Sequence, residues 1–342
     1  MFHNKHSHQT LKQFLIIQTA SLGDVILSTA LAESLHKRFP DAAIDYLVKQ
    51  GYEGLFKGHP FIRTVHSWNK RKKKYRNLIN LAIAVRKTKY DAVVNVQRFF
   101  TSGFLTAFSG SPVRSGFDKN PLSFTFSNKV KHEISRERNA IHETERNHQL
   151  LSWIADIKIS KPGLYPSKSD YSSTGKWTTG RYITISPASL WFTKQFPVHK
   201  WIEFVNNIQQ EIGVILLGAS DDQKLCQQII AGATKSGVVS LSGILDFLQS
   251  AAVMKGALMN FVNDSAPMHL ASGVNAPVTA VYCSTVPAFG FGPLSDDSGI
   301  IEAIPVPECR PCGLHGLRKC PLNHFKCAET INTEQLLDRL DV

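Results

Sequence analysis

The feature that most constrains the fold is a regular alternation of short apolar segments with amphipathic helical segments. In the first half of the chain we expect strands at 14–18, 43–48, 62–65 and 92–96, and helices at 24–38, 77–87 and 141–155. Strands that alternate with helices form a parallel sheet with helices on both faces. The first half therefore predicts an α/β domain.

The same alternation starts again after residue 180. Here we expect strands at 182–186, 214–217, 261–262, 278–282 and 300–304, and helices at 200–210, 221–231 and 245–254. The stretch between the halves is rich in Pro, Gly, Ser and Thr and is typical of a linker. We predict an N-terminal domain at 1–160, a linker at 161–180 and a C-terminal domain at 181–342. Two such units favour doubly wound domains that face each other across a ligand-binding cleft.

Charge is the clearest compositional feature. The net charge of the 342-residue chain is +12, which predicts an anionic partner: nucleic acid, a membrane surface or a phosphorylated substrate. The run 70–76 alone holds six cations in seven residues; it is either a solvated helix entry or a surface for acidic groups. No apolar run approaches the roughly 20 residues of a membrane span, and the polar N-terminus lacks a signal core. We therefore expect a cytoplasmic protein.

The segment 261–285 reads as strand, tight turn, short helix, glycine stop and second strand. The side chains of Asn263, Asp264 and Ser265 are expected to cap the helix. Free N–H groups at such a helix start, at the carboxyl end of a strand, attract phosphate or carboxylate. His269, one turn later, should point toward the same mouth. The alternative is an ordinary, well-capped connection between two strands.

Two further turns carry candidate chemistry. The turn at 19–24, TASLGD, has one glycine where the dinucleotide fingerprint needs three, so NAD binding there is not expected. Asp24 in this turn is either a plain N-cap or a general base. In the loop after strand 182–186, the hydroxyl of Ser189 and the ammonium of Lys194 are placed to reach a phosphate.

Together these motifs resemble glycosyltransferase family 9, the heptosyltransferases. The resemblance rests on SLGDVILSTAL at 21–31, KQFP at 194–197, LLGASDD at 216–222 and the segment 263–285, and it extends over 14–340. It implies the GT-B architecture, with two Rossmann-like doubly wound domains. The N-terminal domain would bind the acceptor, and the C-terminal domain would bind a nucleotide sugar, usually ADP-heptose.

The resemblance also implies residue roles. Asp24 would be the catalytic base, and Lys194 would neutralise the leaving diphosphate. The substrate-binding residues would be Gly23, Ser189, Asp222, Asp264, Ser265, Ala266 and His269. The implied reaction is an inverting single displacement without metal or other cofactor. Ala266 stands where relatives usually have Gly, and we expect phosphate binding to survive the added methyl group.

The expected partners follow from the same resemblance. The donor would be ADP-heptose, and the acceptor an anionic lipopolysaccharide core at the cytoplasmic face of the inner membrane, either Kdo-lipid A or its heptosylated form. No nucleic acid is expected. Two alternatives stay open: the same architecture with another nucleotide sugar or acceptor, and a basic nucleic-acid-binding protein organised around 70–76.

The six cysteines fall into two groups. Cys226 and Cys283 lie in apolar contexts and should be buried thiols. Four others cluster near the C-terminus: Cys309, Cys312, Cys320 and Cys327. Their spacing is weaker than a paired C-x2-C zinc signature. A structural zinc, disulfides and reduced packing thiols all remain open for this cluster.

Overall fold

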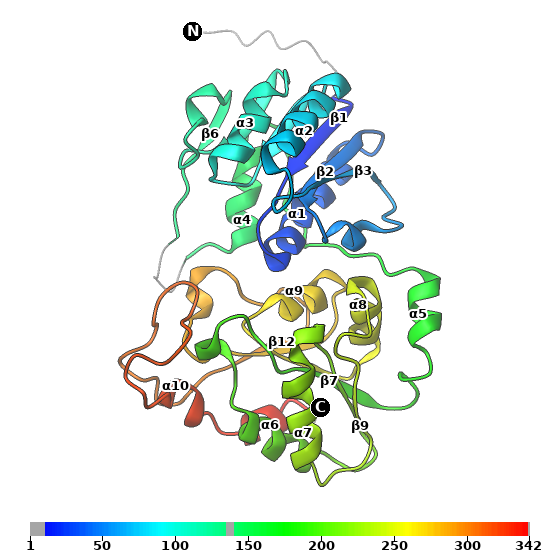
Figure 1. Cartoon of the computed structure of the whole chain (residues 1–342), viewed down its shortest axis with the longest axis vertical. Coiled ribbons are helices and arrows are strands. Elements are labelled where there is room, and N and C mark those ends of the chain that lie inside the picture. Colours follow the sequence, from blue (N-terminus) through cyan, green and yellow to red (C-terminus); the bar gives the residue numbers. More distant parts are fainter. Residues whose placement is uncertain (1–10, 135–139, 341–342) are drawn as a thin grey trace. The chain divides into compact units, whose positions relative to one another are not determined.

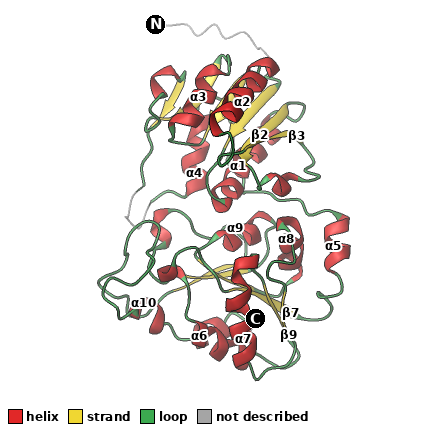
Figure 2. Ribbon diagram, in the orientation of Figure 1, coloured by secondary structure: helices red, strands yellow, loops and turns green. Residues whose placement is uncertain are grey.

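The computed structural model describes residues 11–134 and 140–340. The described chain divides into two compact units, one of residues 11–133 and 144–162, the other of 134, 140–143 and 163–340. Each unit is built on one six-stranded sheet (Figure 1, Figure 2). Every strand pairing in the two sheets is parallel, as the alternation of strands and helices predicts.

The sheet of the first unit has the order β3-β2-β1-β4-β5-β6. Its strands are β1 (Gln13–Ile17), β2 (Ala43–Lys49), β3 (Ile62–Trp68), β4 (Ala92–Asn95), β5 (Val113–Phe117) and β6 (Asn128–Val130). The helices are α1 (Leu22–Arg38), α2 (Lys74–Thr88), α3 (Phe100–Phe108) and α4 (Glu143–His148), the last of which begins at the boundary of the unit. The predicted helix at 141–155 is wrong in length, because α4 gives way to a 3-10 turn at Gln149–Leu151. Strands β5 and β6 and helix α3 were not predicted.

Side chains that alternate along the strands fill the two faces of this first sheet. Leu15 and Ile17 of β1 pack in one cluster with side chains of α2 and α3. On the opposite face of β2, the Tyr46 hydroxyl lies 3.0 Å from Ser28 Oγ of α1. Because neighbouring residues of a strand point to opposite faces, α1 and the α2/α3 pair cover the sheet from its two sides.

The sheet of the second unit has the order β12-β11-β10-β7-β8-β9. Its strands are β7 (Tyr182–Ser186), β8 (Gly213–Leu216), β9 (Val238–Ser240), β10 (Asn260–Asn263), β11 (Val278–Val281) and β12 (Ser298–Ile301). The helices are α5 (Lys168–Thr174), α6 (Val198–Asn206), α7 (Gln223–Gly232), α8 (Phe247–Gly256), α9 (Ala266–Gly273), α10 (Lys326–Glu329) and α11 (Glu334–Leu337). The segment 161–180, predicted as a linker, contains α5, which packs against α8.

The core of the second unit joins the sheet to its C-terminal segment. Trp201 and Phe204 of α6 pack with Phe261 of β10, and Cys327 and Leu336 close the same cluster. On the other side of the sheet, the Tyr182 hydroxyl donates to the Val253 carbonyl of α8 at 2.8 Å. In the part of the chain that the structure describes, no helix has the length and apolar character needed to cross a bilayer.

Both sheets have the same topology. Counted within each unit, the strand order is 3-2-1-4-5-6, so the direction of winding reverses between β1 and β4 and between β7 and β10. Open α/β sheets bind ligands outside the carboxyl ends of strands at this reversal. The loops after these four strands are therefore where a functional site is expected.

Candidate functional site

In the second unit, Asn263 at the end of β10 ties together the loops at the reversal point. Its Nδ2 donates to the Pro187 carbonyl at 2.7 Å, and its Oδ1 accepts from the Phe196 N–H at 2.9 Å. The loop after β7 is thereby held beside the start of α9. The prediction that Asn263 caps the helix is wrong, because both ends of its amide bind this neighbouring loop.

Lys194 and Asp264 form an ion pair at this edge of the sheet. Lys194 ends the 3-10 turn Phe192–Lys194, and its Nζ lies 2.7 Å from Asp264 Oδ2. Only 14% of the Lys194 side chain and 10% of the Asp264 side chain are exposed. The Thr285 hydroxyl donates to the same carboxylate oxygen at 2.5 Å. These contacts fix the ammonium group of Lys194 at the mouth predicted from the sequence.

The start of α9 keeps a free backbone donor. Ser265 is the N-cap residue, but its side chain donates to the Asn263 carbonyl at 3.3 Å and accepts nothing from the helix. The predicted capping by Asp264 and Ser265 is therefore wrong, since Asp264 is paired with Lys194. Among the described residues, the N–H of Ala266 has no acceptor. A free N–H at a helix N-terminus is suited to an anion.

His269 lies in α9 and is buried. Burial, together with smaller effects of the nearby His142 and Lys194, lowers the pKa of His269 to about 3. The ring is therefore neutral at physiological pH. Its Nδ1 is buried and has no hydrogen-bond partner within the described residues. His269 can contribute a hydrogen bond at this site, but no charge.

Ser189 and Asp222 lie in the loops after β7 and β8. The Ser189 carbonyl accepts from Gln195 Nε2 at 2.6 Å, which folds the loop back on itself. Asp222 Oδ2 accepts from the Ala219 N–H at 2.7 Å. A Cβ at Gly218 would lie 2.8 Å from Asp222 Cβ, so this tight turn needs glycine. Both residues thus stand at the edge that carries Lys194.

Several residues that support this site were missed from the sequence. Thr193 Oγ1 accepts from Ser284 Oγ at 2.9 Å and from the Leu317 N–H at 2.8 Å. Arg310 is buried, donates from Nε to the Thr285 carbonyl at 2.9 Å and pairs with Glu302. These partners lie far apart in sequence, so no local pattern could have revealed them.

In the first unit, Asp24 lies in the first turn of α1. The helix begins at Leu22 and not at Asp24, and Ser21 is its N-cap. Asp24 Oδ2 accepts from the Ser21 N–H at 3.1 Å, and the Asp24 N–H donates to Ser21 Oγ at 3.5 Å, which makes a capping box. The Ser21 hydroxyl also donates to Asp24 Oδ2 at 2.7 Å. Asp24 is therefore not the N-cap itself. Among the described residues nothing donates to its Oδ1, so one carboxylate oxygen is free to accept a proton. Gly23, the residue before it, is buried.

One cation of the basic run is part of the same edge. Lys70 Nζ donates to the Thr19 carbonyl at 2.6 Å, in the loop between β1 and α1, and lies 4.9 Å from the centre of the Trp68 ring. Burial lowers the pKa of Lys70, and the charges of Lys49 and Lys74 add to the effect. The remaining cations of the run, residues 71–74 and 76, are exposed.

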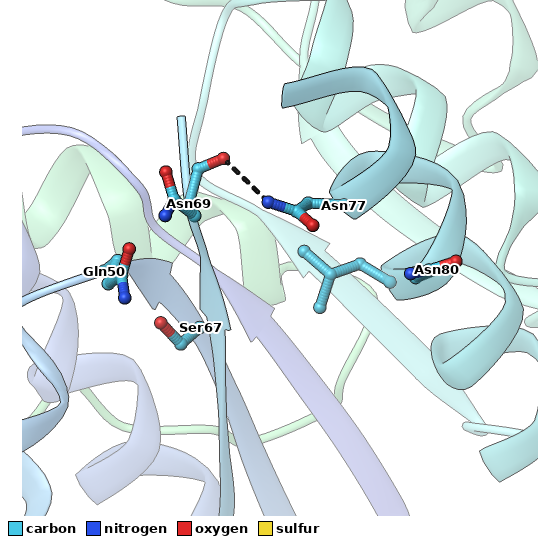
Figure 3. A pocket seen from close by; sticks show the side chains of 6 residues that line it. Gln50, Ser67, Asn69, Asn77 and Asn80 are labelled. Carbon is cyan, nitrogen blue, oxygen red and sulfur yellow. Dashed lines mark hydrogen bonds between the residues drawn. The ribbon is translucent and has the colours of Figure 1, made fainter. Parts of the chain in front are cut away.

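A polar hollow of about 310 Å³ lies between α2 and the carboxyl ends of β2 and β3. It is lined by amide and hydroxyl side chains with one leucine: Gln50, Ser67, Asn69, Asn77, Asn80 and Leu81 (Figure 3). Asn77 Nδ2 donates to the Asn69 carbonyl at 3.5 Å across one wall. Such a wall offers both donors and acceptors to a polar ligand.

The six cysteines are all free thiols in the structure. Cys226 and Cys283 are buried, as predicted. In the C-terminal cluster, Cys309 Sγ lies 4.0 Å from His324 Nε2, while Cys327 packs in the core of the second unit. Within the described residues, no three Cys, His, Asp or Glu side chains are arranged to hold a metal ion. The structure therefore gives the zinc alternative no support.

Comparison with known proteins places the chain in a family. A model of glycosyltransferase family 9 (heptosyltransferase) matches residues 78–313, which is more than half of the sequence. The chain belongs to this family. It is therefore a glycosyltransferase, as the motifs around Asp24, Lys194 and Asp264 predict.

Individual relatives of this family 9 enzyme are distant but cover most of it. Lipopolysaccharide heptosyltransferase 3 of Escherichia coli is 24% identical over 281 residues, 77% of this chain and 81% of the relative. The structure of E. coli ADP-heptose lps heptosyltransferase II matches with a TM-score of 0.78 at 20% identity, over 96% of this chain and 97% of that one. The structure of E. coli heptosyltransferase WaaC with ADP-2-deoxy-2-fluoro heptose matches with a TM-score of 0.69 at 19% identity, over 95% of this chain and 99% of that one. The expected GT-B architecture is confirmed.

Proposed function

We propose that this family 9 enzyme transfers a heptose from ADP-heptose to an anionic sugar of the lipopolysaccharide core. The observation that carries the proposal is the Lys194–Asp264 pair, which holds an ammonium group beside the start of α9 where the winding of the second sheet reverses. A cation and a free helix N–H at this point suit a diphosphate. Support for the donor comes from the WaaC relative, whose structure contains an ADP-sugar analogue.

The leaving group is assigned to the second unit. Lys194 would neutralise the charge that grows on the departing diphosphate, because a fixed cation lowers the energy of the developing anion. The Ser189 hydroxyl, the Ala266 N–H and the neutral His269 ring would add hydrogen bonds. The Asp264 carboxylate repels phosphate, so we assign it the role of positioning Lys194. Ser265 would lie near the phosphates, and Asp222 would lie near the nucleoside.

The attacking group is assigned to the first unit. The free Oδ1 of Asp24 would accept the proton of the acceptor hydroxyl as its oxygen bonds to the anomeric carbon. The bond from that carbon to the diphosphate breaks on the opposite side, ADP leaves, and the configuration inverts. In this scheme Lys194 and the helix N–H neutralise the leaving group without metal, a point that assays in EDTA test.

The polar hollow is the proposed seat of an acceptor sugar. Amide side chains such as Gln50 and Asn80 recognise sugar hydroxyls by hydrogen bonds, and Lys70 and Lys49 on the same side attract an acidic sugar. Because such an acceptor is carried on a membrane lipid, we also propose that the enzyme works at the cytoplasmic face of the inner membrane.

A pair of variants tests the base. Asp24→Asn should lower kcat by about a thousandfold, the scale of a lost general base, with the Kd for ADP unchanged. Ser21→Ala is the matched control, because it removes the hydroxyl that bonds Asp24 in the capping box and keeps the carboxylate; its kcat should stay within about threefold. Turnover at the wild-type rate in Asp24→Asn would rule out Asp24 as the base.

The donor is tested by binding assays with ADP-, UDP-, GDP- and CDP-sugars in EDTA. Selective binding of ADP-heptose supports the proposal. Selective binding of another nucleotide sugar would assign the same fold to a different transfer, and loss of all binding in EDTA would contradict the metal-independent scheme.

A further inference from the structure

The outer face of α2 carries apolar side chains that no part of the described chain covers. Tyr75, Ile79 and Ile83 are 70%, 54% and 49% exposed. They stand four residues apart and so form one stripe along the helix, beside the face of Leu78, Ala82 and Val85, which packs on the sheet. A surface helix of a globular protein normally places polar residues at these outer positions.

The neighbouring helix α3 continues this apolar surface. Phe100 and Phe108, at its two ends, are 57% and 53% exposed, and Phe99 just before it is exposed as well. Helices α2 and α3 pack against each other on one side of the first sheet (Figure 1). Arg86 of α2 donates to the Phe108 carbonyl at 3.2 Å, which links the two helices. We call the six exposed apolar side chains and the cations around them the α2/α3 surface.

The charges around these side chains are almost all positive. From residue 69 to 112 the chain carries ten Lys or Arg side chains and a single acid, Asp91. Asp91 is occupied by the backbone N–H groups of Lys12 and Gln13 at 2.7 and 2.9 Å. The exposed cations lie at both ends of the α2 stripe: residues 71–74 and 76 at its start, and 86, 87 and 89 at its end.

This combination points to one kind of partner. A second copy of the chain docked on this surface would place cations of one copy against cations of the other, and the repulsion between like charges opposes such self-association. A bilayer with anionic lipids matches both properties at once, because cations bind the headgroups while isoleucine and aromatic side chains enter the boundary of the acyl region. We propose that the α2/α3 surface docks on an anionic lipid bilayer.

Docking here deepens the proposed function, because it assigns the surface that would hold the enzyme on the membrane of its lipid-linked acceptor. The identity of that membrane rests on the proposed function. The binding itself needs neither ADP nor acceptor, so it is measured without them. A failed transfer assay and a failed docking assay are thus separate results.

The test is flotation with vesicles of phosphatidylcholine, with or without about a third phosphatidylglycerol. The wild-type chain should float with the anionic vesicles and should be released as salt is raised. Arg71→Gln/Lys72→Gln/Arg76→Gln should weaken partitioning about a hundredfold, at roughly fivefold for each cation. Ile79→Gln/Ile83→Gln should weaken it roughly tenfold, since about half of each side chain is available for burial.

Matched controls lie in the second unit. Lys168→Gln/Lys224→Gln/Lys319→Gln removes three exposed cations, and Ile244→Gln/Leu322→Gln removes two exposed apolar side chains. Both should bind vesicles like wild type, and circular dichroism should show that all variants are folded. Failure of the wild type to float, or equal losses in the matched controls, would overturn the proposal. The proposal would also be overturned if duplex or single-stranded oligonucleotides bound the chain at the salt concentration used for flotation, and if Ile79→Gln/Ile83→Gln weakened that binding as much as it weakens vesicle binding.

Discussion

Replacing Asp264 by Asn should destabilise the second unit by about 3 kcal/mol, because it leaves the Lys194 ammonium buried without its counter-charge. The two groups are 2.7 Å apart and largely shielded from water. Losing one partner of a buried pair typically costs about 3–5 kcal/mol. The low end is expected here, since the amide oxygen that replaces the carboxylate can still accept a hydrogen bond from Lys194.

A double-mutant cycle separates the pair from its surroundings. Lys194→Met should cost about 2 kcal/mol, less than the first change, because Asp264 keeps its hydrogen bond from Thr285. With both changes no unpaired charge remains, so the double variant should be no less stable than Asp264→Asn. The coupling free energy should then be about 2 kcal/mol or more.

The assay is urea unfolding followed by tryptophan fluorescence, with Trp68 and Trp153 of the first unit replaced by Phe so that only Trp177, Trp191 and Trp201 of the second unit report. Asp221→Asn, which changes an exposed carboxylate of the same unit, is the control and should change the free energy of unfolding by less than about 0.5 kcal/mol. If the destabilisation of the double variant equals the sum of the two single-variant values to within about 0.5 kcal/mol, Lys194 and Asp264 are not a coupled pair. The role of Asp264 in positioning Lys194 would then have to be abandoned.

Further predictions concern titration, thiols and the loop after β7. Burial lowers the pKa values of His59 and His132 to about 4 and of His269 to about 3, so the unfolded chain binds more protons between these values and pH 6.5. The free energy of unfolding, measured by denaturation at a series of pH values, should therefore fall as pH drops from 6.5 to 4. In His269→Gln one titrating group is absent, so the slope should be smaller by up to about 1.4 kcal/mol per pH unit. Burial raises the pKa of Cys320, but hydrogen bonds from the backbone N–H groups of residues 322–325 outweigh this effect and lower it. Mass spectrometry after treatment with iodoacetamide should therefore find Cys320 modified fastest, whereas the buried Cys226 and Cys283 should stay unmodified in the folded chain. Asn263→Ala should raise the Kd for ADP at least about tenfold, because it releases the loop of Lys194 and leaves a buried N–H unpaired; calorimetry that finds an unchanged Kd would contradict this.

The sequence predicted the elements that have a strong local period. The apolar runs at β1, β2, β7 and β8 and the helical pattern of α1 extend over enough residues to be recognised alone. Strands β5 and β6 were missed because one is polar and contains glycine and the other has three residues. Helix ends were displaced by a few residues, as at α1, since capping depends on which side chain takes the free N–H groups.

For the site, the sequence by itself determined which residues stand after which strands: Asp24 after β1, Lys194 after β7, and Asp264 after β10. Local patterns reach this far because strand, turn and helix are neighbours in the chain. Only the tertiary structure decided that Asp264 binds Lys194 instead of capping α9, and that Asn263 holds the loop at Pro187 and Phe196. Those partners lie about 70 residues away and meet because β7 and β10 are paired in the sheet. The physical reason is that each polar side chain binds the nearest available partner, and strand pairing sets which partner that is.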